Sequence, residues 1–146
     1  MPSPRLATRA VILHQNRLLL VNAWPAPDSN LWCAPGGGVE RGASLPDNLA
    51  REVFEETGLR IKVGLPCLVN EFHDPAGSFH QVEVFFRATI MSGVLSDDWK
   101  DPEGIVNKRR FFSCHEAEQL KLKPDSLLRI AWGEGIHYDP LEPILR

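Results

Sequence analysis

Apolar, β-capable residues fill two runs near the start of the chain, at residues 6–13 and 17–24. The polar triplet at residues 14–16 separates them, a spacing that predicts a β-hairpin. Residues 25–30 are rich in proline and small polar side chains and predict a loop. Residues 31–33 form another short apolar run. The chain is therefore expected to begin with a hairpin and one short strand.

A helical period follows residue 44. Ser44 is a good N-cap, and Asp47 three residues later completes a capping-box pattern. Pro46 falls in the first turn, where its missing N–H is not needed. Gly58 is suited to end the helix in a left-handed conformation. The apolar or small residues between these signals recur at helical spacing. They are Leu49, Ala50, Val53, Phe54 and Thr57.

The second half of the chain predicts two long strands joined by a turn, an acidic loop, one further strand and two helices. In chain order these are residues 60–73, 79–91, 96–104, 106–112, 113–120 and 124–132. The tail from Gly133 has no clear period and is expected to cover a sheet edge. Strands, one helix, strands and then helices do not alternate as in a doubly wound fold. The order predicts an α+β sandwich with a mixed sheet between helices.

The 146 residues have the length of a single domain, expected to span residues 1–146. The chain carries 16 basic and 19 acidic residues, for a net charge of −3. This balance argues against partners such as nucleic acid or an anionic membrane surface. If the substrate is an anion, a bound metal ion is the obvious means of attracting it.

Targeting and redox signals are sparse. No apolar run approaches the 18 or so residues of a transmembrane helix, and the first residues lack a signal-peptide pattern. Three widely spaced cysteines, Cys33, Cys67 and Cys114, form no metal-binding or disulfide pattern. They predict buried, reduced thiols in a cytoplasmic protein.

Three glutamates share one face of the predicted helix. Glu52, Glu55 and Glu56 lie at positions i, i+3 and i+4, so their carboxylates repel one another. Such a set suits a hard divalent cation, because Mg²⁺ prefers oxygen ligands and is often shared with substrate phosphates. With Val53 and Phe54 on the opposite face, the acids are expected to point outward. A solvated acidic surface is the alternative interpretation.

The glycine run Gly36-Gly37-Gly38 precedes this helix, where bare backbone can approach a ligand closely or simply form a loop. From Gly37 to Leu59 the sequence resembles the Nudix box, G-x5-E-x7-R-E-U-x-E-E-x-G-U, with U aliphatic. The matching positions are Gly37, Arg51, Glu52, Val53, Glu55, Glu56, Gly58 and Leu59. The resemblance implies a MutT-like Nudix hydrolase with an α/β/α sandwich around a mixed central β-sheet.

One box position departs from the pattern, because Ala43 stands where the first glutamate is expected. The resemblance gives that glutamate a supporting part beside the box arginine, Arg51, and the metal site. Its absence puts full activity and the number of bound metals in question. Glu40 lies nearby and could substitute for it, but its spacing is wrong.

The resemblance implies Mg²⁺-dependent hydrolysis of a nucleoside diphosphate linked to another moiety X, with Mn²⁺ as an alternative ion. Depending on the identity of X, the substrate is a nucleoside triphosphate, ADP-ribose, a nucleotide sugar or a dinucleotide. Glu52 and Glu56 are the expected metal ligands, together with the Gly37 carbonyl, and residues 36–38 are expected to contact substrate. Glu55 is expected to be a further ligand or the catalytic base, and Arg51 to orient the glutamates.

In some Nudix branches the base comes from a loop after the central strands. Glu103 in the acidic loop has a suitable place for this role, and a solvated loop is the alternative.

An aromatic residue could stack on a nucleobase, although packing is the simpler role. The aromatic candidates are Trp24, Trp32 and Phe79.

Three further features have weaker links to function. Strand alternation puts His80 and Glu83 on opposite faces, so they are not expected to act together. Residues 108–110, Lys-Arg-Arg, could bind phosphate or form a basic strand edge. Pro75, sixteen residues beyond Leu59, resembles a feature of the ADP-ribose-hydrolysing branch, but it also sits in an obvious turn.

Two rival functions are left open by the sequence. Ala43 makes a non-catalytic nucleotide sensor conceivable, although a sensor has no need for the intact glutamates. An RNA-decapping enzyme is disfavoured by the acidic balance and the lack of a basic stripe. The expected partner is therefore a nucleotide, with no nucleic acid and no membrane, and the resemblance also suggests a homodimer.

Overall fold

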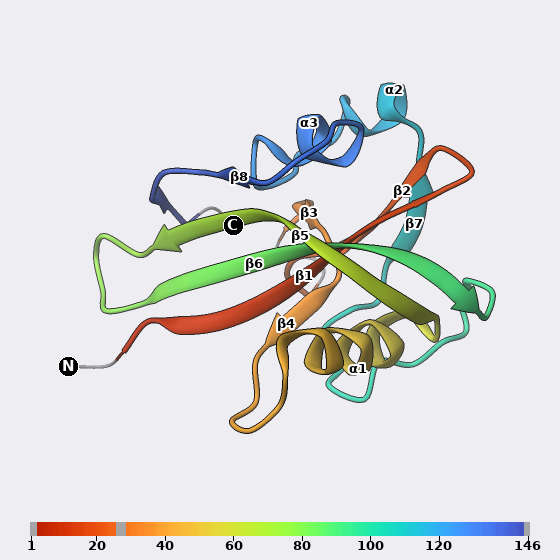
Figure 1. Cartoon of the computed structure of the whole chain (residues 1–146), viewed down its shortest axis with the longest axis horizontal. Coiled ribbons are helices and arrows are strands. Elements are labelled where there is room, and N and C mark those ends of the chain that lie inside the picture. Colours follow the sequence, from red (N-terminus) through yellow and green to blue (C-terminus); the bar gives the residue numbers. More distant parts are fainter. Residues whose placement is uncertain (1–2, 26–28, 145–146) are drawn as a thin grey trace.

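The computed structural model describes residues 3–25 and 29–144, and its strands form one mixed sheet (Figure 1). The elements, in chain order, are β1 (Arg5–His14), β2 (Arg17–Asn22), β3 (Trp32–Cys33), β4 (Gly36–Gly38), α1 (Leu45–Thr57), β5 (Arg60–His73), β6 (His80–Ser92), β7 (Arg109–Phe112), α2 (Cys114–Ala117), α3 (Leu127–Ala131), β8 (His137–Tyr138) and β9 (Glu142–Pro143). The mixed sheet expected from the sequence is confirmed.

The sheet is organised around β1, which has three neighbours. The strand path is β3-β2-β1-β6-β5-β8, with β4 paired to β1, β7 to β2 and β9 to β5. β1 runs parallel to β6, whereas its hairpin with β2 and its pairing with β4 are antiparallel. The first half of β1 pairs with β4, and its last residues pair with β2. The short strand β4 therefore leads the chain from the sheet directly toward α1.

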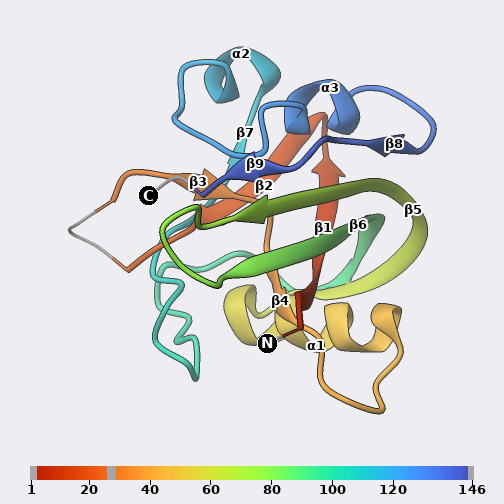
Figure 2. The same cartoon turned by 90° about the vertical axis from the view of Figure 1, so that its left-hand side faces the viewer.

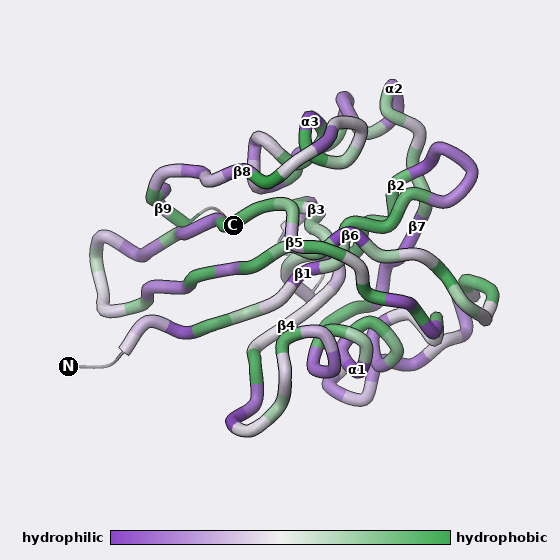
Figure 3. The backbone as a smooth tube through the Cα atoms, in the orientation of Figure 1, coloured by the Kyte–Doolittle hydropathy of each residue, from purple (hydrophilic) through white to green (hydrophobic). Residues whose placement is uncertain are grey.

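The sheet separates two hydrophobic clusters. On β1 and β2, Val11 and Leu18 belong to the cluster under α2 and α3, whereas Ile12 and Leu19 belong to the cluster under α1. This period of two places successive side chains on opposite faces of the sheet. Figure 2 shows α1 on one face and α2 with α3 on the other, and Figure 3 shows hydrophobic stretches along the strands between them. The α/β/α sandwich is confirmed.

Local signals act where the sequence predicts. Gln15 and Asn16 both have positive φ angles, 52° and 61°, as a two-residue hairpin turn requires. Ser44 Oγ accepts a hydrogen bond from the N–H of Asp47, and Gly58 ends α1 with φ 75°. The N-cap and C-cap of α1 are therefore confirmed.

Several boundaries differ from the predictions. The strand expected to start at residue 106 starts at Arg109, because side chains take the preceding N–H groups. The Asp101 carboxylate accepts from residues 105 and 106, and Asn22 Oδ1 accepts from residues 107 and 108. The last two helices shrink to about one turn each, at α2 and α3. The glycine run, for which a loop was one expectation, is strand β4.

The remaining predictions concern the loop at residues 25–30, the tail and membrane-spanning helices. The loop predicted at residues 25–30 falls partly outside the described residues. The tail pairs with β5 through β8 and β9, which confirms that it covers an edge. Among the described residues, no helix is long and apolar enough to cross a membrane.

Candidate active site

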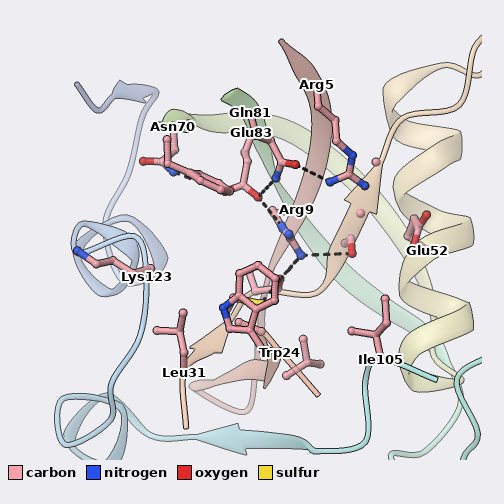
Figure 4. A pocket seen from close by; sticks show the side chains of 18 of the residues that line it. Arg5, Arg9, Trp24, Leu31, Glu52, Asn70, Gln81, Glu83, Ile105 and Lys123 are labelled. Atoms are coloured by element: carbon pink, nitrogen blue, oxygen red, sulfur yellow. Dashed lines mark hydrogen bonds and ion pairs between the residues drawn. The ribbon is translucent and has the colours of Figure 1, made fainter. Parts of the chain in front are cut away.

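The site is a cavity of about 690 Å³ between α1, β4 and the strands β1, β5 and β6, with loop residues completing its rim (Figure 4). A volume of this size is in the range of small-molecule sites. Of the residues singled out from the sequence, the three glycines of β4, Glu52, Glu56 and Glu103 all line it.

Two acids of α1 point into this cavity and not outward as expected. Glu52 and Glu56 are only 6% and 9% exposed. The glycines of β4 make this possible, because they leave room for the helix to approach the strand. A Cβ on Gly37 would lie 2.7 Å from the carboxyl carbon of Glu52. The helix therefore presents these acids to the edge of β4. Phe54, on another face of the helix, packs edge-on against Trp99.

Arg51 holds the acids of α1 in place. Its guanidinium donates to both carboxylate oxygens of Glu55, at 3.1 and 3.2 Å, and to Oε1 of Glu52 at 3.2 Å. It also donates to Oδ1 of Asn48 at 3.0 Å. These contacts are those of an arginine that orients glutamates.

The loop between β4 and α1 brings Glu40 to this arginine. Oε1 of Glu40 lies 3.4 Å from Nη2 of Arg51, although the Glu40 side chain is 70% exposed. The N–H of Ala43 donates to the Glu40 carbonyl, so a turn folds Glu40 back over the helix. The spacing of Glu40 within the box argued against this contact, which the fold of the turn nevertheless makes. Glu40 contributes a carboxylate beside Arg51, where Ala43 has none.

A second group of carboxylates forms across the site. Oxygens of Glu52, Glu55 and Glu103 lie within 4.8 Å of one another, and they are the candidate metal group among the described residues. Three carboxylate oxygens are a hard donor set that fits Mg²⁺ or Mn²⁺. The structure thus brings the acidic-loop residue Glu103 to two of the helical acids.

Glu103 is carried there by an anchored loop. The indole N–H of Trp99 donates to the Glu55 carbonyl at 2.8 Å, and its ring packs against the bare Gly58 at the end of α1. Asp101 accepts from the N–H of Glu103 and closes the turn. The acidic loop is therefore fixed to α1, in contrast to a freely solvated loop.

Glu56 occupies a different position from the other acids. Its Oε1 accepts a hydrogen bond from the N–H of Gly36 at 3.0 Å. Burial raises its pKa to about 8, against the opposing effects of Arg9 and the Gly36 N–H. Burial also raises the pKa of Glu52, and Arg51 opposes this. A nearby cation would stabilise the ionised form of both carboxylates.

The opposite wall of the cavity is a chain of hydrogen bonds that crosses β1, β6 and β5 (Figure 4). Arg5 donates to Oε1 of Gln81, Gln81 donates to Glu83 at 3.1 Å, and Arg9 donates to Glu83 at 2.7 Å. Asn70 lies at the far side of Glu83, with its amide nitrogen 3.5 Å from Oε1. Although burial disfavours the charge of Arg9, neighbouring groups, chiefly Glu83, raise its pKa overall.

Sequence reasoning missed this wall as a functional feature. Two buried polar residues on one face of a long strand, Gln81 and Glu83, were the available signal. The predicted separation of His80 from Glu83 is confirmed, since His80 approaches Glu71 instead, at 3.9 Å.

Some of the aromatic candidates line the cavity, whereas the others and the basic candidates lie elsewhere. Trp24 and Phe79 line the cavity, whereas Trp32 packs edge-on against Phe112 in the core. The phosphate-binding interpretation of residues 108–110 is wrong for Arg109, whose buried guanidinium donates to main-chain carbonyls, including that of Glu56. Arg110 is exposed on β7, as the strand-edge interpretation expects.

The remaining candidates, Pro75 and the three cysteines, are not part of the group of Glu52, Glu55 and Glu103. Pro75 sits in the turn between β5 and β6, as predicted. All three cysteines are free thiols. Cys67 is buried as expected, but Cys33 and Cys114 are partly exposed, which corrects the prediction for these two. Cys33 borders the cavity, and burial raises its pKa to about 12.

Comparison with known proteins matches the chain to the family model for the NUDIX domain over residues 3–132. An ADP-ribose pyrophosphatase of Methanocaldococcus jannaschii is 28% identical over 138 residues, which are 90% of this chain and 76% of that protein. Diphosphoinositol polyphosphate phosphohydrolase 3-alpha of Mus musculus is 35% identical over 104 residues, or 70% of this chain and 58% of that protein. The chain thus spans less than two thirds of the mouse relative.

Solved structures agree on the fold. The crystal structure of a UDP-X diphosphatase superposes with a TM-score of 0.74 at 21% identity, covering 95% of this chain and 68% of the other. The alignment extends over nearly all of the described elements. The sandwich seen here is therefore shared with that structure.

Proposed function

The chain belongs to the Nudix hydrolase family, and from that premise we propose that it hydrolyses a nucleoside diphosphate linked to another moiety, with Mg²⁺ as its cofactor. Membership, with relatives named as pyrophosphatase and phosphohydrolase, makes it a hydrolase of phosphoanhydride bonds. The choice of metal, substrate and site residues is the content of the proposal.

The observation that carries the proposal is the group of Glu52, Glu55 and Glu103 at the edge of a cavity large enough for a nucleotide. These three would hold the metal, with Glu56 and the Gly37 carbonyl as the further ligands expected from the box. Bound there, Mg²⁺ would neutralise phosphate oxygens and lower the pKa of a water molecule.

The chain's own residues then have separate tasks. Arg51 holds Glu55 and Glu52 in one geometry. Glu103 offers one carboxylate oxygen to the metal group and takes the proton of the attacking water with the other, since this carboxylate has no hydrogen-bond or ion-pair partner among the described residues. Glu55 is less free for this step, because both of its oxygens accept from Arg51. A positioned base of this kind contributes roughly 10²–10⁴-fold to a rate.

The cavity favours a nucleotide over other diphosphates. Trp24 and Phe79 line the cavity, and aromatic faces of this kind stack on any base. The named relatives act on different diphosphates, ADP-ribose and a diphosphoinositol polyphosphate. The carboxylate group argues against a sensor that only binds. A cytoplasmic location and a homodimer stay predictions from the sequence.

The test is a substrate panel of nucleoside triphosphates, ADP-ribose, nucleotide sugars, dinucleotides and a diphosphoinositol polyphosphate, each with Mg²⁺, Mn²⁺ or chelator. Turnover of a nucleotide that disappears with chelator is expected. Hydrolysis in ¹⁸O-labelled water, read by phosphorus NMR, would identify the phosphorus attacked. Turnover of the inositol compound alone would overturn the nucleotide assignment, and binding without turnover would favour the sensor.

The base is tested separately with Glu103→Ala. The matched control is Asp97→Asn, an exposed acid in the same loop. We expect kcat to fall by roughly 10²-fold or more in the first variant and to change less than twofold in the second. Unchanged turnover in Glu103→Ala would remove this residue from the mechanism.

A further inference from the structure

Within residues 3–25 and 29–144, three basic side chains line the cavity, Arg5, Arg9 and Lys123, and two of them are already neutralised. Arg9 pairs with Glu83 at 2.7 Å. Lys123 lies 3.1 Å from Asp125 and 3.4 Å from Glu142. Among the described residues, Arg5 is therefore the cavity cation without a carboxylate partner.

The partner of Arg5 is neutral and fixed. Nη1 of Arg5 donates to Oε1 of Gln81, which sits directly beside it in the parallel β1–β6 register. Gln81 is 1% exposed and is held in turn by Glu83, so the amide cannot easily rotate away. The guanidinium keeps its charge and its remaining N–H donors, and the residue is exposed to incoming ligands.

The backbone of β4 connects Arg5 to the carboxylates. A Cβ on Gly38 would lie 2.5 Å from Nη2 of Arg5, and one on Gly37 would lie 2.7 Å from Glu52. Adjacent residues of a strand face opposite sides, so the glycine pair has the arginine on one flank and the acid on the other. Figure 4 shows this arrangement, with Arg5 and Glu52 on either side of the strand.

We infer that Arg5 is a substrate-binding residue that takes a non-bridging phosphate oxygen of the diphosphate, on the flank of β4 opposite Glu52. The inference rests on the proposed function and adds a specific binding group to it. A diphosphate carries charge on both phosphates, and a metal held by Glu52, Glu55 and Glu103 serves one flank. Arg5 supplies the charge on the other, in a fork that matches phosphate oxygens.

The experiment measures binding of α,β-methylene-ADP, a non-hydrolysable diphosphate, by calorimetry with Mg²⁺. Arg5→Ala is expected to weaken its Kd by roughly tenfold to hundredfold, the range for a charged hydrogen bond. Arg5→Lys should lose a smaller factor, because it keeps the charge without the fork. Arg17→Ala is the control, an exposed arginine at the start of β2 outside the cavity, and should stay within twofold.

Kinetics with the hydrolysed panel compound provide the second readout. We expect the KM of Arg5→Ala to rise by a similar factor while kcat changes less than threefold. Wild-type Kd and KM in Arg5→Ala, in a protein that does hydrolyse nucleotides, would overturn the role of Arg5 and leave the proposed function intact. A wild type that neither binds the probe nor hydrolyses any nucleotide would overturn both, and circular dichroism would show that each variant is folded.

Discussion

The two walls of the cavity handle charge in opposite ways. On the α1 wall, carboxylate oxygens of Glu52, Glu55 and Glu103 lie within 4.8 Å of one another, and Arg51 pairs with only the first two. On the strand wall, Glu83 is surrounded by donors from Arg9 and Gln81. The first wall stores uncompensated negative charge that a metal can use. On the second, Glu83 neutralises Arg9, and this buried pair serves as a rigid frame.

This difference separates the α1 acids, which serve activity, from the Arg9–Glu83 pair, which serves stability. Functional sites commonly hold groups that destabilise the fold when unliganded. A buried ion pair, by contrast, becomes costly when one partner is removed. Equivalent substitutions on the two walls should therefore have different readouts.

The largest effect is expected from Glu52→Gln on the α1 wall. Loss of one carboxylate from the metal group should lower kcat by roughly 10²–10³-fold, the range for an electrostatic catalytic group. Stability without metal should be unchanged or higher, because the variant relieves repulsion and the burial of a charge. Steady-state rates and urea unfolding in chelator check both parts. A stability loss comparable to the activity loss would contradict the distinction between the walls.

The matching change on the strand wall is Glu83→Gln. Arg9 would keep a buried charge without its counterion, so the free energy of unfolding should fall by about 3 kcal/mol. Urea denaturation measures this. Glu116→Gln is the control, because its carboxylate approaches Arg17 and Arg110 at an exposed site and can still cap α2. Its free energy of unfolding should fall far less than that of Glu83→Gln. Equal losses in the two variants would mean that the strand wall is not a frame.

The pH dependence of the metal-free protein tests the α1 wall again. The pKa of Glu56 is raised to about 8 from an ordinary 4.5, so folding favours its protonated form. The stabilisation is complete below about pH 4.5 and is lost as the pH rises through about 8. Melting temperatures in chelator should therefore fall over this window.

Glu56→Gln separates this group from the rest of the protein. The amide mimics the protonated carboxyl and removes the titration, so its melting temperature should depend less on pH than that of the wild type. The same slope in both proteins would show that other groups cause the loss.

The sequence could predict the α1 wall because its information is local. The box residues from Arg51 to Leu59 follow one helical period, and Ser44 and Gly58 mark its ends. The long strands were also placed closely, since β5 matches its predicted bounds and β6 starts one residue late. Glu103 was a candidate from its loop, but only the Trp99 anchor shows why it reaches the helix.

The strand wall could not be predicted in the same way. Arg5, Arg9, Gln81 and Asn70 come from three strands, and their contacts depend on the parallel register of β1 with β6. Sequence period gives the face of each strand but not the register between strands. Glycine is also a poor strand former, so the run at 36–38 favours a loop by its sequence, although it pairs with β1.

The smallest effect is expected at the rim of the α1 wall, where Glu40 approaches Arg51. An ion pair this exposed contributes little stability, so Glu40→Gln should reduce kcat by only a few-fold through a less fixed Arg51. Ala43→Glu restores the box glutamate. If Glu40 already serves Arg51, this change should leave the wild-type rate nearly unaltered yet recover the rate of Glu40→Gln.

The double variant decides between two accounts of the loop. Recovery of kcat in Glu40→Gln/Ala43→Glu, with no gain in Ala43→Glu alone, would mean that either carboxylate can hold Arg51. A large gain in Ala43→Glu alone would mean that Ala43 limits the enzyme and Glu40 is no substitute. Because both positions belong to one turn, closed by the bond from the Ala43 N–H to the Glu40 carbonyl, their effects should be non-additive. Additive effects would mean that Glu40 does not help Arg51 to position the carboxylates.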